Sequence, residues 1–428
     1  MTTVNRRLMA VSLAGLTAAA VGLAGCGGGS GAGSANNGSS GGKRTIKVVV
    51  AEYSKDHTRA FWTDLNSQYE KATGNKVDLQ VVDWNVIDQQ VTTMIQNNQP
   101  PDILNLNSFA SYAKDGLLYK TSDIVSADVQ KDILGPFTAG GMLNGVQYAT
   151  PDLSSARAFF YNKDLFAKAG IAAPPTTWDQ FVTDAKKIQA LGNGTIGYAL
   201  PLGPEEAQAE FSIWMWNNGG DWIDGSGKWT INSDKNVQAL QFLADLANKE
   251  KVTQVNPGKT NRTDGAFSLF QDGKVGMVMG FSPLAAELDK QHKVNYGVTQ
   301  MPTNIGTPVT LAVQDFLMGF KKDGSNKDAV AAYLNLYYKT ENIQKFISAE
   351  GFLPVTQSGL QQMSGDAKLK AYLDALPNAK QAPTNDPAWD KVKVAVQQNI
   401  GAAVQPGGDP KKVLDALQKT AEQAAGGN

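Results

Sequence analysis

The chain has 428 residues, a formal net charge of −1 and a hydrophobic fraction of 42%. A balance this close to neutral argues against a nucleic acid or an anionic lipid surface held mainly by charge. A single cysteine excludes disulfides within the chain, so stability must come from buried apolar surface.

The first 25 residues have the parts of a secretory signal. Arg6 and Arg7 precede an apolar run from Leu8 to Ala24 that is rich in Ala and Gly, whereas a membrane span needs roughly 20 strongly apolar residues. Leu23-Ala24-Gly25-Cys26 resembles a bacterial lipobox, which would place a lipid on Cys26 after cleavage. We expect Sec export, with the twin-arginine route as the alternative. A free thiol at Cys26 is the other interpretation.

Cleavage would leave a protein on the outer face of the cytoplasmic membrane. Loss of residues 1–25 removes two basic and no acidic residues, so the net charge becomes −3. Residues 26–42 comprise the lipidated cysteine and a run of Gly, Ser, Ala and Asn, which behaves as a flexible coil. Its sixteen residues after Cys26 would reach roughly 20 to 25 Å.

From Lys43 the pattern changes to short apolar strands alternating with amphipathic helices. Strands are predicted over 46–50, 77–82 and 102–106, and helices over 58–72 and 87–95. This βαβαβ order is typical of an open, mostly parallel sheet in an α/β fold. Roughly 385 residues exceed what one core usually holds, so two lobes are expected.

Later helices have recognisable start signals. Thr177 with Gln180 forms a capping box, and Asp409 with Pro410 opens the last helix. Ser233 and Ser325 precede two further apolar-periodic stretches.

Enzyme motifs are missing from the sequence. His57 and His292 have no metal-ligand spacing, and there is no Cys pair, nucleophile elbow or phosphate loop. We therefore expect no catalytic residue, metal or cofactor. Two carboxylates suffice for glycosidase chemistry, so a cleft hydrolase stays as an alternative. Tyr337 and Tyr338 could be iron ligands, but the helical face shared by Tyr333, Leu334 and Tyr337 favours core packing.

Aromatic and amide side chains gather near predicted strand ends and turns. They are Trp84, Asn105, Asn107, Trp214, Trp216, Trp222 and Trp389. Ligands of open α/β sheets bind beyond the carboxyl ends of the strands. Aromatic faces and amides suit the C–H faces and hydroxyls of a sugar, so this pattern indicates a carbohydrate site.

Several segments resemble the family 1 extracellular solute-binding proteins of ABC importers, the group that includes maltose-binding protein. They are Tyr148-Ala-Thr-Pro151, Phe159 to Gly170, Pro174 to Trp178, Asn218 to Asp221, Phe270 to Gly280, Asn295 to Val298 and Gly351 to Pro354. The resemblance spans nearly the whole mature chain in the family's order.

The resemblance implies a two-lobed type II periplasmic-binding-protein fold, each lobe a mostly parallel sheet flanked by helices. Crossovers are expected near 150–155, 280–283 and 337–340. Lobe one would hold 43–151 plus 281–337, and lobe two 152–280 plus 338–428. The lobes would close on a ligand by a population shift.

The resemblance also implies site residues. The turns after the first and third strands hold Glu52, Tyr53 and Ser54, and Asn105, Asn107 and Ser108. Arg157 lies just beyond the first crossover, and Trp214 and Trp389 fall where relatives place stacking aromatics. Phe281 occupies a position where many relatives have Trp, which argues against long maltodextrins. Asp315 either faces the cleft or is a solvated turn residue.

These features predict a monomeric carbohydrate receptor that delivers a mono- or oligosaccharide to an ABC permease, without nucleic-acid binding. The alternative ligand is a polyol or a glycerol phosphate. It would require a cationic cluster in the cleft, for which the sequence offers Arg157.

Overall fold

The computed structural model describes residues 43–322, 325–363, 365, 372 and 378–426. The predicted signal, Cys26 and the tether lie outside these residues. Residues 43–428 form one compact unit, and its strands make two mixed sheets and a small hairpin. No helix in the described part of the chain combines the length and hydrophobicity needed to cross a membrane.

Sheet one contains the predicted βαβαβ run. Parallel pairing joins β1 to β2 and to β3, whereas β11 runs antiparallel to β3 and β6. Its strands are β1 (Thr45–Ala51), β2 (Lys76–Val82), β3 (Ile103–Leu106), β6 (Thr150–Ala156), β11 (Thr310–Gly319) and β12 (Ala379–Lys380). A register shift interrupts the β11–β6 pairing between Asp315 and Phe316.

Sheet two has the order β10-β7-β9-β8. Its strands are β7 (Ala158–Asn162), β8 (Ile196–Ala199), β9 (Val275–Gly280) and β10 (Tyr296–Thr299), and the separate hairpin is β4 (Met142–Leu143) with β5 (Val146–Gln147). β7 is antiparallel to both β9 and β10, while β8 is parallel to β9. The expected α/β fold is present, but its sheets are mixed, because β7 and β11 arrive from the other sheet instead of from a local helical crossover.

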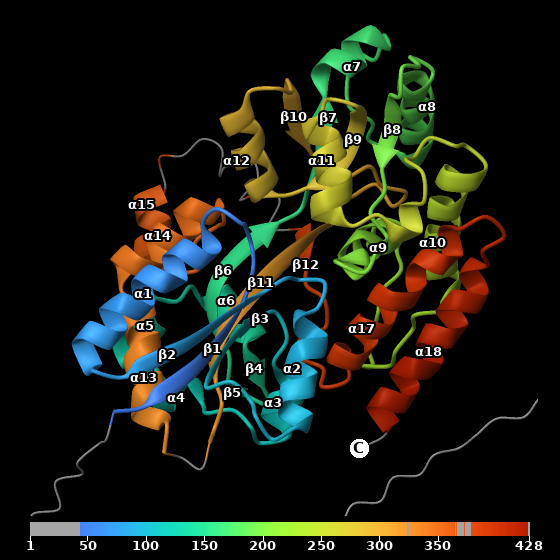
Figure 1. Cartoon of the computed structure of the whole chain (residues 1–428). Helices are drawn as coiled ribbons and strands as arrows, with labels where there is room; N and C mark the ends of the chain where they lie inside the picture. The colour runs from blue at the N-terminus through green and yellow to red at the C-terminus, as the bar shows by residue number, and fades with distance from the viewer. Residues whose placement is uncertain (1–42, 323–324, 364, 366–371, 373–377, 427–428) are drawn as a thin grey trace, which may run out of the picture. The chain divides into compact units, whose positions relative to one another are not determined.

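Helices surround both sheets (Figure 1). Nearest sheet one are α1 (Thr58–Thr73), α2 (Ile87–Gln96), α3 (Ala110–Lys114), α4 (Thr121–Ile124), α5 (Ala127–Asp132), α6 (Gly135–Gly140), α13 (Lys327–Tyr337), α14 (Thr340–Glu350) and α15 (Gln357–Met363). Nearest sheet two are α7 (Lys163–Lys168), α8 (Trp178–Gln189), α11 (Ser268–Gln271) and α12 (Ser282–Gln291). α9 (Ala207–Trp216) packs on β8 through Trp214 and Tyr198 and also contacts β11, and α10 (Asp234–Asn248), α17 (Trp389–Asn399) and α18 (Pro410–Gly426) pack on α9 and on one another.

Local sequence explains the boundaries of these helices. α1 buries Phe61, Trp62, Leu65 and Tyr69 on one face and ends at Gly74, whose φ of 74° suits glycine. The Thr177 hydroxyl accepts a bond from the Gln180 amide at the start of α8, as the capping box predicts. α13 begins after Asn326 instead of Ser325.

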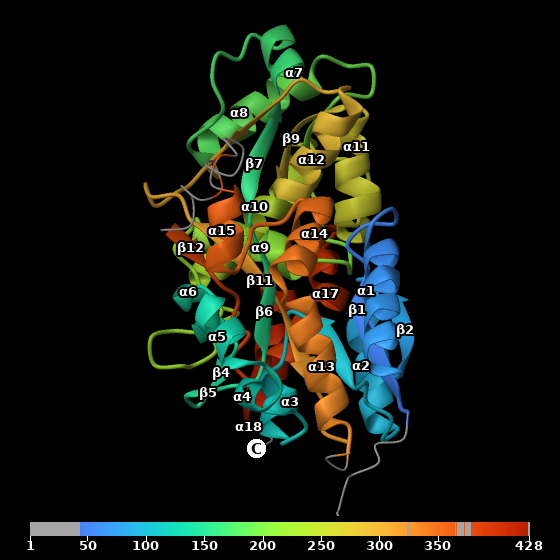
Figure 2. The same cartoon turned by 90° about the vertical axis from the view of Figure 1, so that its left-hand side faces the viewer.

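The chain passes between the sheets at places that strand pairing defines. The first passage is at Arg157, between β6 and β7, which Figure 2 shows continuing along one line. The second lies at 300–309 and the third at 381–388, because β10 pairs in sheet two and β12 in sheet one.

These passages correct the predicted second and third crossovers. Residues 296–299 belong with sheet two, not with lobe one. α14 also belongs beside sheet one, because Phe346 packs 4.7 Å from Phe61 of α1, measured between ring centroids. Apolar periodicity predicts that a segment is buried, but it does not identify the sheet on which it packs.

Candidate functional site

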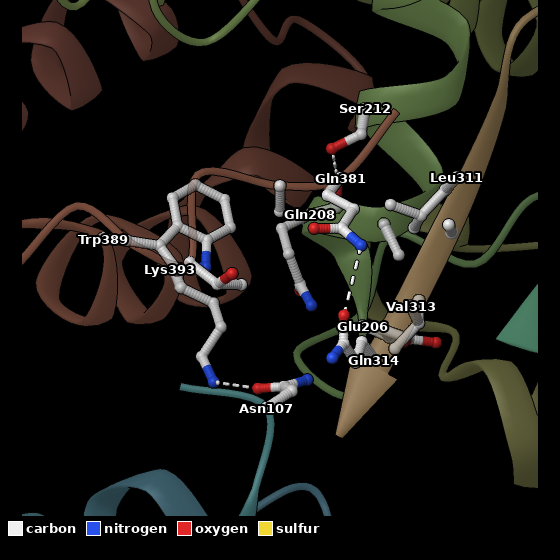
Figure 3. A pocket seen from close by; sticks show the side chains of 14 residues that line it. Asn107, Glu206, Gln208, Ser212, Leu311, Val313, Gln314, Gln381, Trp389 and Lys393 are labelled. Atoms are coloured by element: carbon white, nitrogen blue, oxygen red, sulfur yellow. Dashed lines mark hydrogen bonds between the residues drawn. The ribbon is translucent and has the colours of Figure 1, made fainter. Parts of the chain in front are cut away.

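A narrow cavity lies between β11 of sheet one and the helices α9 and α17 (Figure 3). Its walls come from β11, the loop after β3, the start of α9 and the first turns of α17. The lining residues are Asn107, Glu206, Gln208, Ala209, Ser212, Leu311, Ala312, Val313, Gln314, Gln381, Ala382, Thr384, Trp389 and Lys393. The volume of about 40 Å³ holds a few water-sized groups, so a sugar ring requires the walls to move apart.

α17 contributes Trp389 and Lys393, which are four residues apart and therefore share one helical face. The Trp389 ring stacks on Trp229 at 6.3 Å between centroids and meets the edge of Trp222. The Lys393 ammonium donates to Asp88 Oδ1 at 2.8 Å and to Asn107 Oδ1 at 3.0 Å, the second of which is visible in Figure 3. An aromatic ring and a cation are thus held rigidly at the cavity wall.

Two buried arginines form a charged layer near the first passage between the sheets. Arg157 pairs with Glu206, and Arg262 pairs with both Glu206 and Glu205. Both guanidinium groups lie over the Phe281 ring, at 4.1 Å for Arg157 and 4.9 Å for Arg262. Burial lowers the pKa of each arginine to about 10, so both remain charged at neutral pH. Phe281 therefore supports the two cations and does not present a free stacking face.

A chain of polar side chains connects β1, β3, β6 and β11. The Tyr53 hydroxyl donates to Asp315 Oδ2 at 2.7 Å and lies 3.1 Å from Asn105 Oδ1. Asn105 Nδ2 in turn donates to Asp152 Oδ2 at 2.8 Å. Burial raises the pKa of Asp315 to about 6 and that of Asp152 well above its ordinary value. Asp315 is therefore a buried member of the network and not a solvated turn residue.

The raised pKa of Asp315 predicts a pH-dependent stability. The folded state prefers the protonated carboxyl, so this stabilisation is complete below about pH 4 and is lost as pH rises through about 6. Asp315→Asn should remove about 2 to 3 kcal/mol of pH dependence between pH 4 and pH 7. Denaturant unfolding of both proteins at several pH values measures this, and parallel stability curves would contradict it.

Buried donors and acceptors near this layer remain without hydrogen-bond partners among the described residues. The donors are Arg157 Nε and Nη1 and Arg262 Nε, and the acceptors are Asp315 Oδ1 and Gln208 Oε1. Leaving such groups unpaired is costly. A hydroxyl both donates and accepts, so a group of hydroxyls suits this mixture better than an anion or a cation alone.

The predicted site residues do not all lie at the cavity. Asn107 and Trp389 line the cavity, and Tyr53, Asn105, Arg157, Phe281 and Asp315 form the buried layer next to it. Trp84 is half-buried, and its ring lies edge-on to Tyr53 with 5.5 Å between the centroids. Ser108 is buried beside Asn107, and Glu52 follows β1.

Trp214 lies elsewhere. It is fully buried, its indole N–H donates to Glu210, and its ring packs against Trp178, Phe181 and Tyr198. This core packing accounts for Trp214 without a ligand.

Six charged residues of the site were not predicted from the sequence: Asp88, Asp152, Glu205, Glu206, Arg262 and Lys393. Lys393 could have been found from its four-residue spacing to Trp389. The arginine pairs join residues 49 to 57 positions apart, which no local pattern reveals. Among the described residues, no group of three or more His, Cys, Asp or Glu side chains could hold a metal ion.

One family model matches more than half of the chain. Residues 52–344 match the family model described as bacterial extracellular solute-binding protein. A Brucella abortus protein named only as a binding protein is 28% identical over 87% of this chain and 92% of its own. The diacetylchitobiose binding protein DasA of Streptomyces coelicolor is 24% identical over 91% of each chain. A glycerol-3-phosphate-binding protein of Yersinia enterocolitica is 28% identical, but over 54% of this chain and 52% of its own.

Solved structures share the fold. An ABC substrate-binding protein from Listeria monocytogenes in complex with cycloalternan superposes with a TM-score of 0.75 at 21% identity, covering 90% of this chain and all of that one. Maltose-bound MalE3 of T. maritima gives the same TM-score and identity, with 89% and 99% coverage. The chain thus has the α/β fold of these binding proteins, with two mixed sheets flanked by helices.

Proposed function

The chain belongs to the bacterial extracellular solute-binding protein family, whose members serve ABC transporters and are not enzymes, and we propose that it captures a mono- or oligosaccharide for a membrane permease. The solute would bind between the two sheets, in the cavity that Trp389 and Asn107 line. Relatives and structural neighbours named for diacetylchitobiose, cycloalternan and maltose support a sugar.

The observation that carries this proposal is the charge balance of the buried layer. Arg262 adds the second cation that a phosphate site would need, but Glu205 and Glu206 already pair with both arginines. Lys393 is likewise paired with Asp88. An anionic ligand would have to displace these carboxylates, whereas the hydroxyls of a neutral sugar can use the donors and acceptors that remain.

A glycerol phosphate or polyol is the second candidate, favoured by the Yersinia relative and by the two buried arginines. Tryptophan fluorescence and thermal shift of the 43–428 unit with neutral sugars, polyols and glycerol phosphates would separate the two. Saturable binding of one sugar series with a raised melting temperature supports the proposal. A response to glycerol phosphates alone would overturn the sugar assignment.

Two lobes are proposed around the two sheets. The described parts of 43–156 and 310–380 would move with sheet one, and those of 158–299 and 389–426 with sheet two. Arg157, 300–309 and 381–388 would then form the hinge. Closure on the solute would create the surface that the permease recognises.

Attachment to the outer face of the cytoplasmic membrane through a lipid on Cys26 is also proposed, with residues 27–42 as the tether. Cys26→Ser should move most of the protein from the membrane fraction of producing cells to the soluble fraction, because one thioether-linked lipid group is the anchor. Immunoblots of both fractions measure this, with Ser30→Ala as the control. Equal membrane retention of both variants would contradict the anchor.

A further inference from the structure

One group of polar contacts joins the two proposed lobes beside the cavity. Asp88 of α2 and Asn107 after β3 bind Lys393 of α17, and Ser111 of α3 donates to Asp390 of α17. α2 and α3 lie beside sheet one, whereas α17 packs on α9 and α18, which belong to the proposed lobe around sheet two. We call Asp88, Asn107, Ser111, Asp390 and Lys393 the clasp.

The clasp is a partly buried and mutually satisfied set. The Lys393 side chain is 3% exposed and that of Asp88 16%, so solvent and salt screen their attraction weakly. Two of the three ammonium donors of Lys393 have protein acceptors, and Asp390 accepts from Ser111. Opening the cleft would move α17 away from α2 and α3 and break these bonds, and water would then bind the separated groups.

Asp88 allows an effect on cleft closure to be distinguished from direct contact with the solute. Asn107 and Lys393 line the cavity, but Asp88 does not. The Asp88–Lys393 ion pair therefore satisfies both of its groups without any contribution from a bound molecule. Its stabilising effect belongs to the closed arrangement itself.

We infer that the clasp holds the cleft closed in a substantial fraction of molecules before any solute binds, and that Asp88 and Lys393 are positioning residues for closure. This inference rests on the proposed function in one respect, namely that the cleft opens to admit a solute. Because a solute that favours the closed state gains affinity from anything that stabilises closure, the clasp also sets the dissociation constant.

The test measures closure with no solute present. Spin or dye labels at Lys76→Cys near sheet one and Lys249→Cys near sheet two occupy exposed positions of a unit that has no native cysteine. Distance distributions are compared for this labelled protein and for the same protein carrying Lys393→Met or Asp88→Asn. Lys391→Met, an exposed charge on the same helix, is the matched control.

The expected result is a fall of about 10- to 100-fold in the closed-to-open ratio for Lys393→Met and Asp88→Asn, the range for losing a charged hydrogen bond. Lys391→Met should leave the ratio unchanged. The double exchange Asp88→Lys with Lys393→Asp should restore part of the closed population, which a general folding defect would not allow. Circular dichroism checks that each variant is folded.

Two results would overturn the inference: a single open population in the unmodified protein, or equal distributions for the clasp variants and Lys391→Met. Neither depends on the identity of the solute. If no sugar of the panel binds but the clasp variants open the cleft, the proposed sugar ligand is contradicted and the role of the clasp in closure is supported. If sugars bind and the clasp variants change nothing, the clasp fails alone.

Discussion

Replacing Arg262 by methionine is expected to lower the free energy of unfolding of the 43–428 unit by about 3 to 5 kcal/mol. Arg262 Nη2 lies 2.9 Å from Glu205 Oε1, and the Glu205 side chain is only 5% exposed. Burial alone would raise the pKa of Glu205, but the charge of Arg262 and bonds from Thr263 bring it below its ordinary value. Methionine keeps the apolar volume over Phe281, so the loss is mainly that of the buried charge pair. Urea unfolding followed by circular dichroism measures it.

Two further variants test the cause of this loss. Lys345→Met removes a cation from an exposed pair with Asp64, whose side chains are 59% and 48% exposed, and should cost less than about 1 kcal/mol. Glu205→Gln added to Arg262→Met should restore part of the stability, because the unpaired carboxylate is then neutral. Equal costs for Arg262→Met and Lys345→Met would show that the buried pair contributes little.

The strands and helices of the N-terminal region could be predicted because their signals are local. Predicted strands at 46–50, 77–82 and 102–106 fall within one residue of the observed strands at each end. Core packing of Tyr333 and Tyr337 is confirmed by their stacking on Trp62. Each of these features depends on a repeat of two or about 3.6 residues, which the chain itself displays.

Sheet membership could not be predicted in the same way. β10 is four residues long and pairs with β7, more than 130 positions earlier. Trp214 shows the same limit inside a helix, because every residue of α9 is buried. Because no face of α9 is exposed, its sequence does not indicate which side chains line the cavity and which pack in the core.

The site residues at the ends of strands could be predicted from the sequence, whereas the residues that form buried ion pairs could not. Tyr53 and Asn105 meet because parallel strands bring their carboxyl ends to one edge. Glu205, Glu206 and Arg262 depend on contacts between distant segments, so each looked like an ordinary surface charge. Their pairing changes the expected ligand chemistry, since it neutralises the cations that a phosphate would require.

Trp389→Ala should weaken binding of the sugar identified by the ligand panel by about 1 to 3 kcal/mol, which is roughly 5- to 150-fold in Kd. Trp389 is the one aromatic side chain among the described residues that line the cavity. Its ring is supported from behind by Trp229, so it forms a rigid face against which a sugar C–H surface can pack. Titration of the folded variant by calorimetry gives the affinity without using tryptophan fluorescence.

Trp229→Ala is the control that shows whether Trp389 contacts the sugar directly or acts only through core packing. Trp229 is 4% exposed and Trp389 2%, and their rings stack with an angle of 6° between planes, but Trp229 does not line the cavity. Both substitutions should cost about 3 to 5 kcal/mol of stability, because each removes a large buried ring. Only Trp389→Ala should also lose sugar affinity at a temperature where both proteins are folded. Equal losses of affinity would mean that Trp389 acts through the core, and the aromatic face of the site would then have to be sought at Tyr53 and Trp84.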